Sequence, residues 1–474
     1  MSRAMTLLSL SLCSLVLGAF PENMAAQTPN VNVTTWQQDS AASSICTGCV
    51  YRTGQNLSES RIDNTISKSN FGQFCNYTLD GEVYGQPLVV TNVKFQGGVA
   101  HTVVYVVTMN DSVYAFDGAP PSPTSNGCTL LAPKIPLLPS GSNETAVDCT
   151  QVGGKYCLTI APKVGTLGTP VISTRTLGDG STGGTLYAVA ESQLPDGSQF
   201  YHRLWALDIT SLSPVGGSPI LILPSGNACP SDPQLFSQKH IQRPALLLAG
   251  DSYLYVAFSM MDGTPPPLPN GTIFAYNTAN LTSSLCFAFS SGISGSDGGG
   301  IWGGGGGPAY GPDANTGTNS KYYTFFNTAN GQFGTNSNYG DSFIKMYNTG
   351  SALQVSNYFS PGDQYFRSNK GQPGCTGDGD TDFGSGFPML IPDHENSTNP
   401  FLAVSGDKEG GIWFMDRTLP GQGGSMTCMS NMNTNVQTFA INGSGNVGNG
   451  PVIHTNAAFW ETPGNEQTGG LAHL

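Results

Sequence analysis

The 474-residue sequence contains few charged residues and no basic cluster. Only 10% of its residues are Asp, Glu, Lys or Arg, and 18 basic residues against 31 acidic ones give a formal net charge of −13. No run of Lys and Arg could neutralise a series of phosphates, which a nucleic-acid-binding protein requires. The composition therefore argues against nucleic acid as a partner, and we attribute the acidity to solubility.

The sequence also lacks an apolar run long enough to cross a membrane. The apolar stretch Leu7–Phe20 follows a basic start at Arg3 and precedes the small residues Ala25 and Ala26. This arrangement is typical of a secretory signal peptide. We expect residues 1–26 to be removed and the mature protein to be secreted, in a periplasmic or extracellular compartment, with no transmembrane segment.

Sequence signals of nucleophilic catalysis and of a metal site built from histidines are absent. No GxSxG sequence occurs, and the six histidines lack the spacing of metal ligands. Ten cysteines remain once Cys13 is removed with the signal, and an even number in an exported chain predicts disulfides. Cys46 and Cys49 have the spacing of a redox or zinc pair, but no second pair accompanies them, so we expect a structural bridge there. The pairing of the cysteines stays open.

Glycine and proline, in contrast, are abundant, with 62 and 32 residues. Six prolines, each before a short apolar run and all but Pro388 after a small or polar residue, recur every 63 to 83 residues: Pro87, Pro170, Pro244, Pro308, Pro388 and Pro451. At least five of these runs are followed by two more strand-like runs, with no helical pattern between them. A repeat of this length and composition is typical of the blades of a β-propeller.

The predicted fold is therefore an all-β propeller of four-stranded blades. About six units are visible, which we interpret as part of a ring of seven or eight blades. Residues 81–474 form the propeller, and residues 27–80 precede it, with Asn30–Trp36 expected to complete the last blade and close the ring. The sixth unit opens at Gly450-Pro451 without recognisable second and third strands. Either that blade is incomplete or the chain is a fragment of a longer product, and we favour the fragment.

The strand directions place distant residues on one face of this propeller. In one unit the three strands are expected at Pro244–Ala249, Tyr253–Ser259 and Thr272–Tyr276. Because antiparallel strands alternate in direction, the start of the first strand and the turn between the second and third lie at the same end. We call this end of the blades the entrance face, and we expect it to carry a central funnel. The residues expected there are Tyr84–Gln86, Asn110–Asp111, Thr169, His240–Arg243, Trp302, Asp378–Ser385 and Lys408–Glu409.

Three groups of entrance-face residues could reach a ligand in the funnel. Arg243 could form a bidentate contact with an anion, or could equally stack on or hydrogen-bond a loop of a neighbouring blade. His240 could act as acid or base, but we favour a structural role for it. Trp302 lies within the glycine run 298–307 and could stack on a planar ring or a sugar, or pack between blades. Lys408 and Glu409 form a charged turn that could reach the funnel or remain a surface turn.

Asp378, Asp380 and Asp382 alternate as carboxylates do in calcium loops. The twelfth residue of the segment is Met389, where an EF-hand has glutamate, and no helical pattern flanks it. A calcium site completed by backbone carbonyls and a solvated acidic turn both remain open.

Several segments resemble the quinoprotein-like, or pyrroloquinoline-quinone-type, β-propeller family, in its secreted branch. They are Tyr51–Asn56, Phe71–Gly72, Asp80–Pro87, Val104–Gly118, His240–Leu248, Gly299–Ala309 and Lys408–Arg417. In the alcohol dehydrogenases of that family the quinone lies over the propeller axis beside a calcium ion. An aspartate acts as base, a tryptophan stacks under the ring, and a disulfide between adjacent cysteines covers it. The present chain has no adjacent cysteine pair.

The resemblance implies an exported propeller that binds pyrroloquinoline quinone and calcium and oxidises an alcohol or a sugar. The cofactor-binding residues would be Arg243, His240, Trp302, Lys408 and Gln86, with Arg243 and Lys408 on the carboxylates of the quinone and Trp302 on its ring.

For the same function, Asp378, Asp380 and Asp382 would hold calcium, and Asp380 or Asp382 would take the substrate proton. The alternative is a non-catalytic propeller that binds a protein or a polysaccharide through its loops.

Overall fold

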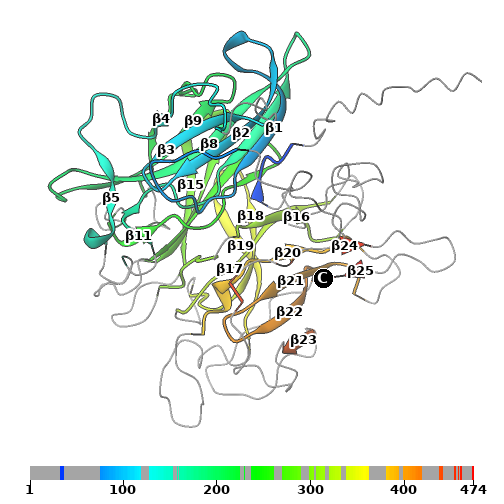
Figure 1. The fold of residues 1–474 in the computed structure, drawn as a ribbon. Coiled ribbons are helices and arrows are strands. Elements are labelled where there is room, and N and C mark those ends of the chain that lie inside the picture. The colour runs from blue at the N-terminus through cyan, green and yellow to red at the C-terminus, as the bar shows by residue number, and fades with distance from the viewer. Residues whose placement is uncertain are drawn as a thin grey trace, which may run out of the picture.

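The computed structural model describes residues 32–36, 75–118, 127–152, 157, 160–224, 229, 236, 238–260, 270–289, 298–303, 306–314, 320–331, 338–361, 381–393, 399–418, 437–440, 453, 454, 457, 460, 461, 472 and 473. In these residues the chain forms antiparallel β-sheets that follow one another in chain order (Figure 1). Three short 3₁₀ turns accompany them, η2 (Phe95–Gly97), η3 (Cys149–Gln151) and η6 (Phe383–Ser385). The all-β prediction is confirmed.

The first sheet has the spatial order β1 (Leu88–Lys94), β2 (Ala100–Thr108), β3 (Ser112–Asp117) and β4 (Ile135–Pro136). The second sheet has the order β10 (Ile220–Leu221), β9 (Phe200–Asp208), β8 (Thr182–Gln193), β5 (Thr145–Asp148) and β6 (Lys163–Val164), and β7 (Val171–Thr176) also pairs with β8. The third sheet runs from β11 (His240–Ile241) through β13 (Tyr253–Met260) and β14 (Gly271–Asn277) to β15 (Asn280–Phe289), with β12 (Leu247–Ala249) beside β13.

The fourth sheet has the order β16 (Ala309–Pro312), β17 (Tyr322–Asn327), β18 (Phe343–Asn348) and β19 (Leu353–Phe359). The fifth has the order β20 (Met389–Leu390), β21 (Leu402–Gly406), β22 (Gly411–Asp416) and β23 (Gln437–Ala440). A two-stranded ladder of β24 (Trp460–Glu461) and β25 (Ala472–His473) follows. The sequence reading did not recognise this ladder, because strands of two residues carry no alternating pattern.

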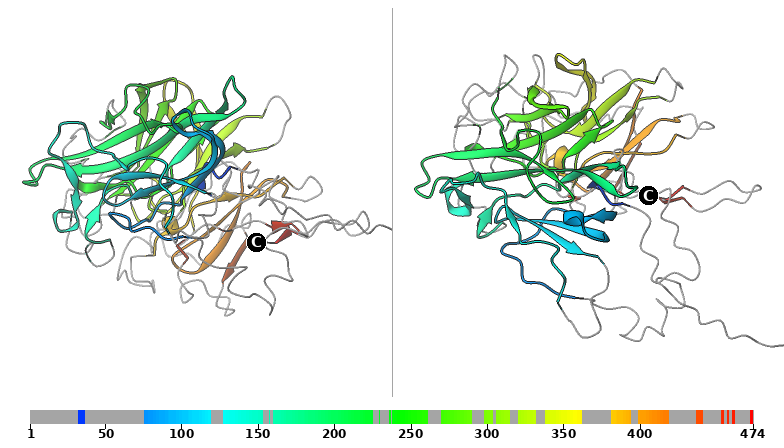
Figure 2. Two further views of the ribbon diagram at one scale, coloured as in Figure 1. Left: turned by 45° about the horizontal axis from the view of Figure 1, so that its top comes forward. Right: turned by 90° about the horizontal axis from the view of Figure 1, so that it is seen from above.

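Each sheet packs face to face on the next one, so the central sheets are apolar on both faces. Separate hydrophobic clusters lie between the first and second sheets around Trp205, between the second and third around Phe258, and between the third and fourth around Phe326. A fourth cluster, around Trp413, joins the fourth and fifth sheets. The first strands of neighbouring sheets also touch, β7 with β12, β12 with β16 and β16 with β20 (Figure 2). This succession is consistent with a propeller.

The turns of each sheet reach the next sheet at the entrance face. Asp111, in the turn between β2 and β3, accepts a hydrogen bond at Oδ1 from the Thr166 hydroxyl at 3.0 Å, just before β7. Asp341, in the connection between β17 and β18, accepts one at Oδ1 from the Phe383 amide at 3.0 Å, in the segment before β20. A second-to-third-strand turn therefore lies beside the start of a first strand, as the strand directions predict.

The segments before the first strands are linked to one another in the same way. The Gln86 amide donates to the Thr169 hydroxyl at 2.9 Å, and the Ser385 hydroxyl donates to the Ile453 carbonyl at 2.6 Å. Further bonds join the Ala245 amide to the Gly306 carbonyl at 2.8 Å and the Gly303 amide to the Gly384 carbonyl at 3.3 Å. The segments before the first strands therefore lie side by side between the first and second sheets, and from the third sheet to the fifth and on to Ile453.

Residues 32–36 lie at the first and second sheets. The Val33 amide and carbonyl both bond to Val89 of β1, at 2.7 and 2.8 Å, and the Thr34 carbonyl accepts from the Ile172 amide of β7 at 2.7 Å. The sequence analysis expected Asn30–Trp36 to complete the last blade. Within the described residues 32–36, only Val33 forms a β-bridge, with Val89 of the first sheet, and no named strand is present.

Among the described residues, three disulfides join Cys75 to Cys128, Cys149 to Cys157 and Cys229 to Cys286. They bear out the expectation of disulfide bridging and fit an oxidising compartment. Cys46, Cys49 and the expected signal peptide lie outside the described residues. Within the described part of the chain, no helix is long and apolar enough to cross a membrane.

Candidate functional site

An ion pair at the entrance face joins the fifth sheet to the segment that precedes it. Lys408, in the turn between β21 and β22, places Nζ 3.2 Å from Oδ2 of Asp382, and its amide donates to the Asp382 carbonyl at 3.1 Å. Oδ1 of Asp382 accepts from the Asn330 amide at 3.1 Å. Both charged side chains are largely shielded from water, with 24% and 14% of their surface exposed. The carboxylate is therefore held in a fixed orientation by groups from two sheets.

Arg243 and Trp302 form a second contact on the same face. The Arg243 guanidinium lies over the Trp302 ring, with Cζ 5.8 Å from the ring centre, which is within the range of a cation–π interaction. Arg243 belongs to the entrance of the third sheet, whereas Trp302 comes from the glycine-rich segment before the fourth. Trp302 is partly buried and packs against the cluster that contains Ile241 and Leu167. The ring thus has apolar support on one side and a cation on the other.

His454 connects these two contacts. Partial burial lowers the pKa of its imidazole, the positive charges of Arg243 and Lys408 lower it further, and the Asp382 carboxylate acts in the opposite direction. All three charged groups are therefore close enough to His454 to act on its proton equilibrium. Arg243, Trp302, Asp382, Lys408 and His454, which we call the entrance cluster, come from four different units of the fold.

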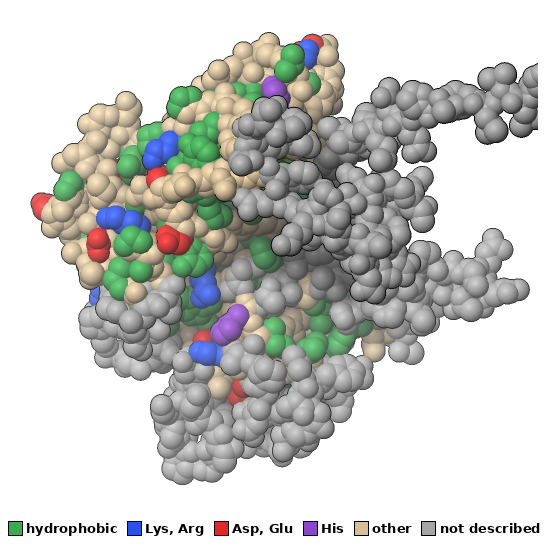
Figure 3. All heavy atoms as spheres, viewed as in Figure 1, with side chains coloured by type: hydrophobic (Ala, Val, Ile, Leu, Met, Phe, Trp, Pro, Cys, Tyr) green, Lys and Arg blue, Asp and Glu red, His purple; other side chains and the backbone are tan. Residues whose placement is uncertain are grey.

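The entrance cluster holds two cations, Arg243 and Lys408, and the carboxylate of Asp382, in a chain whose net charge is −13. The turn that carries Lys408 also holds two buried acidic residues, Asp407 and Glu409. Figure 3 shows a histidine side chain in the middle of the viewed face, with basic and acidic side chains next to it. The cluster therefore combines cations that can bind an anion with carboxylates close by.

The glycine run beside Trp302 allows neighbouring segments to approach closely. At Gly303, where φ is +40°, a Cβ would lie 1.3 Å from Cε2 of Phe387. At Gly300 a Cβ would lie 2.2 Å from Oγ of Ser259. The sequence suggested that this run admits a ligand or another part of the chain, and in the described residues it admits side chains of the third and fifth units.

His240 and Gln86 lie apart from the entrance cluster. His240 is 1% exposed, and its Nδ1 and Nε2 lie 2.9 and 2.7 Å from the carbonyls of Phe236 and Asn270. Burial lowers its pKa to about 4, so the ring is neutral at physiological pH. Gln86 lies at the first sheet, where its amide bonds to Thr169. Both residues were expected to bind the cofactor. In the structure the ring of His240 lies in the core beside two carbonyls, and the described contact of Gln86 is with the second sheet.

Two of the three expected calcium ligands, Asp378 and Asp380, lie outside the described residues. The third, Asp382, already accepts from Asn330 and Lys408. No group of three or more His, Cys, Asp or Glu side chains arranged for a metal occurs among the described residues.

Sequence reasoning did not single out His454 as a candidate. It follows the sixth repeated proline by three residues, and the other entrance residues lie near the equivalent prolines. Because the first strands of all units start on the same face, the position of His454 beside the sixth proline could have identified it as an entrance-face residue.

No family model matches the chain, and no curated protein matches it. Among solved structures it is similar to a europium-containing methanol dehydrogenase, at 15% identity and a TM-score of 0.42, over 83% of this chain and 57% of that one. The chain thus spans little more than half the length of that protein. It is also similar to Drosophila Plexin A in complex with Semaphorin 1b (10% identity, TM-score 0.21, 76% of this chain and 80% of that one). Drosophila Semaphorin 1a, extracellular domains 1-2, matches with 10% identity and a TM-score of 0.18 over 77% and 81% of the two chains.

Proposed function

We propose that the entrance cluster binds a planar, anionic small molecule, and that this molecule is a quinone of the pyrroloquinoline-quinone type. The observation that carries the proposal is the convergence of Arg243, Trp302, Lys408, Asp382 and His454 from separate units onto one face. Arg243 and Lys408 would bind the carboxylates, Arg243 through a planar bidentate contact. The Trp302 ring would cover one face of the ligand.

The proposed reaction is the oxidation of an alcohol or a sugar. When bound, the quinone supplies a two-electron acceptor. Asp382, fixed by the Asn330 amide and by Lys408, is the carboxylate that would take the proton of the substrate hydroxyl. The imidazole of His454, neutral because partial burial and then two cations lower its pKa, would accept or return a proton beside it. A calcium ion would need ligands from Asp378 and Asp380 in addition to Asp382.

The test is calorimetric titration of the mature protein with pyrroloquinoline quinone, with and without calcium. We expect Arg243→Ala to weaken binding about 10- to 100-fold, the usual effect of losing a charged hydrogen bond. Arg175→Ala is the matched control, because Arg175 lies exposed at the end of β7. Equal binding by Arg243→Ala and the wild type, or no binding by the wild type, would remove the quinone proposal. The non-catalytic scaffold would then be the better account.

A further inference from the structure

A cleft lies at the first and second sheets, and none of the entrance-cluster residues line it. It encloses about 470 Å³ and is lined by Tyr77, Leu79, Asp80, Gly81, Glu82, Met109, Asn110, Pro162 and Lys163. This volume falls in the range of small-molecule sites, roughly 300–1,000 Å³. One wall is the segment that precedes β1, and the other is formed by β6 and the residue before it. We propose that this cleft binds a neutral saccharide.

The first wall presents an exposed aromatic ring in a fixed position. Tyr77 keeps 45% of its surface exposed, yet its ring makes edge-on contacts with Tyr114 and Phe116, at centroid distances of 6.1 and 5.3 Å. Two residues upstream, Cys75 is bonded to Cys128. A preorganised, exposed ring of this kind can stack on the apolar face of a pyranose without an ordering cost at binding.

Asp80 anchors the same wall three residues downstream. Its carboxylate accepts hydrogen bonds from the hydroxyls of Thr108 and Ser112, at 2.9 and 2.6 Å, and pairs with Lys134. These donors lower the pKa of Asp80 to about 2, against the opposing effect of its burial, so the group stays ionised. Asp80 therefore holds the segment on the first sheet, and its charge is balanced within the protein.

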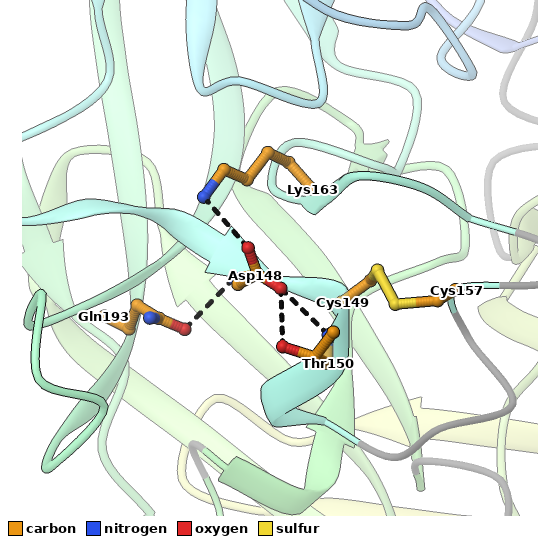
Figure 4. Close-up of a disulfide and its surroundings, with 6 residues drawn as sticks. All are labelled: Asp148, Cys149, Thr150, Cys157, Lys163 and Gln193. Atoms are coloured by element: carbon orange, nitrogen blue, oxygen red, sulfur yellow. Dashed lines mark hydrogen bonds and ion pairs between the residues drawn. A yellow bond between two sulfur atoms is a disulfide. The ribbon is translucent and has the colours of Figure 1, made fainter.

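The opposite wall is also braced (Figure 4). Lys163 of β6 pairs with Asp148 of β5 at 3.5 Å, and the Asp148 amide donates to Oε1 of Gln193 at 3.1 Å. The next residue, Cys149, is bonded to Cys157, and its amide donates to the Pro162 carbonyl at 3.1 Å. Each wall of the cleft thus has its own disulfide and its own ion pair. Such bracing suits a preformed site.

The polar groups that line the cleft match hydroxyls, which both donate and accept hydrogen bonds. Asn110 offers Oδ1 and its second amide hydrogen, Lys163 offers an ammonium, and Tyr77 offers a phenol. Glu82 is exposed, forms no ion pair with any described residue, and adds an acceptor with a negative charge. Because the ion pairs balance the other charges, this carboxylate disfavours an acidic ligand. The lining therefore favours a neutral saccharide.

Titration calorimetry with cellohexaose and with chitohexaose, on the disulfide-intact protein, tests the proposal. At least one of the two should bind with a dissociation constant on the order of 1 mM or tighter. Tyr77→Ala should weaken binding about tenfold or more, and Tyr77→Phe should keep most of it. Tyr322→Ala is the matched control, because Tyr322 is 49% exposed but lies on β17, outside the cleft.

Glu82→Gln keeps the test decisive if Tyr77→Ala does not fold. Because Glu82 is exposed, its replacement should leave the melting temperature unchanged but alter the affinity for the hexasaccharide. Binding of neither sugar by the wild type, or equal binding by the wild type, Tyr77→Ala and Glu82→Gln, would overturn the proposal. Arg243→Ala should not change the affinity for the hexasaccharide. A failure of the quinone proposal can therefore be distinguished from a failure of the saccharide proposal.

Discussion

Two buried aspartates, Asp111 and Asp407, occupy equivalent turns of the first and fifth sheets but have different neighbours. Each is 0% exposed and lies between the second and third strands of its sheet. Asp407 is satisfied locally. Its Oδ1 accepts from the amides of Glu409 and Gly411, at 3.0 and 2.7 Å, and its Oδ2 accepts from Nε1 of Trp413 at 2.6 Å. Its main effect is therefore to fix its own turn.

Asp111 instead depends on the next sheet. Oδ1 accepts from the Thr166 hydroxyl, while Oδ2 has no hydrogen-bond partner among the described residues. Burial raises the pKa of Asp111 well above its usual value. Glu191 of β8, 2% exposed, has its pKa raised by burial and then by the charge of Asp111. The turn of the fifth sheet thus holds a carboxylate, Asp407, whose oxygens are hydrogen-bonded. The equivalent turn of the first sheet holds Asp111, which forms a pair of proton-retaining carboxyl groups with Glu191.

Removal of the Asp407 carboxylate should have the largest effect. Asp407→Ala leaves two buried amides and the Trp413 indole without an acceptor, so we expect a loss of about 3–5 kcal/mol in the free energy of unfolding. Urea denaturation measures it. Asp416→Ala, which removes a local cap on the Thr418 amide at 2.7 Å, is the control and should cost only about 1 kcal/mol. Similar losses in both variants would show that the local bonds of Asp407 do not stabilise the fifth sheet.

Changing Glu191 should alter how stability depends on pH. A carboxyl with a raised pKa in the folded state stabilises the fold fully below its unfolded pKa, about 4, and that stabilisation is lost as the pH rises towards the folded value. The wild type should therefore lose stability as the pH rises above about 4, by up to about 1.4 kcal/mol per pH unit for each proton retained. Glu191→Gln, which cannot ionise, should flatten this slope.

Thermal melting at several pH values, with Glu144→Gln as a comparison, would show the effect. Glu144 pairs with Arg203, so its replacement should lower stability without flattening the slope. Parallel pH profiles for the wild type and Glu191→Gln would contradict the assignment of a retained proton to this pair.

Thr166 should have the smallest effect of the three positions. Thr166→Val removes the hydroxyl that donates to Asp111 while keeping the shape of the side chain, and we expect a loss of about 1 kcal/mol. Thr166→Ser, which retains the donor, should preserve more of the stability if the hydrogen bond matters. If Ser is as destabilising as Val, packing and not hydrogen bonding determines the effect at this position.

The sequence predicted where the strands occur better than it predicted which segments lie next to them. Tyr253–Ser259 and Thr272–Tyr276 were placed within one residue of the ends of β13 and β14, because alternating and aromatic-rich runs carry a local signal. Asn30–Trp36 also had a strand pattern, but its pairing with Val89 depends on contacts with the first two sheets. Strand direction alone placed Arg243, Trp302 and Lys408 on one face. It could not show that His240 turns into the core beside Phe236.

The sequence by itself determined the all-β class, the repeated units, the use of disulfides and the face on which candidate residues lie. Each of these depends on local periodicity, on composition or on the alternation of strand direction. Only the tertiary structure decided that Asp382 pairs with Lys408, that His454 joins Arg243, and that Tyr77 and Lys163 line one cleft. Those contacts join segments from different sheets, and the distance between two such side chains is set by how the sheets pack together.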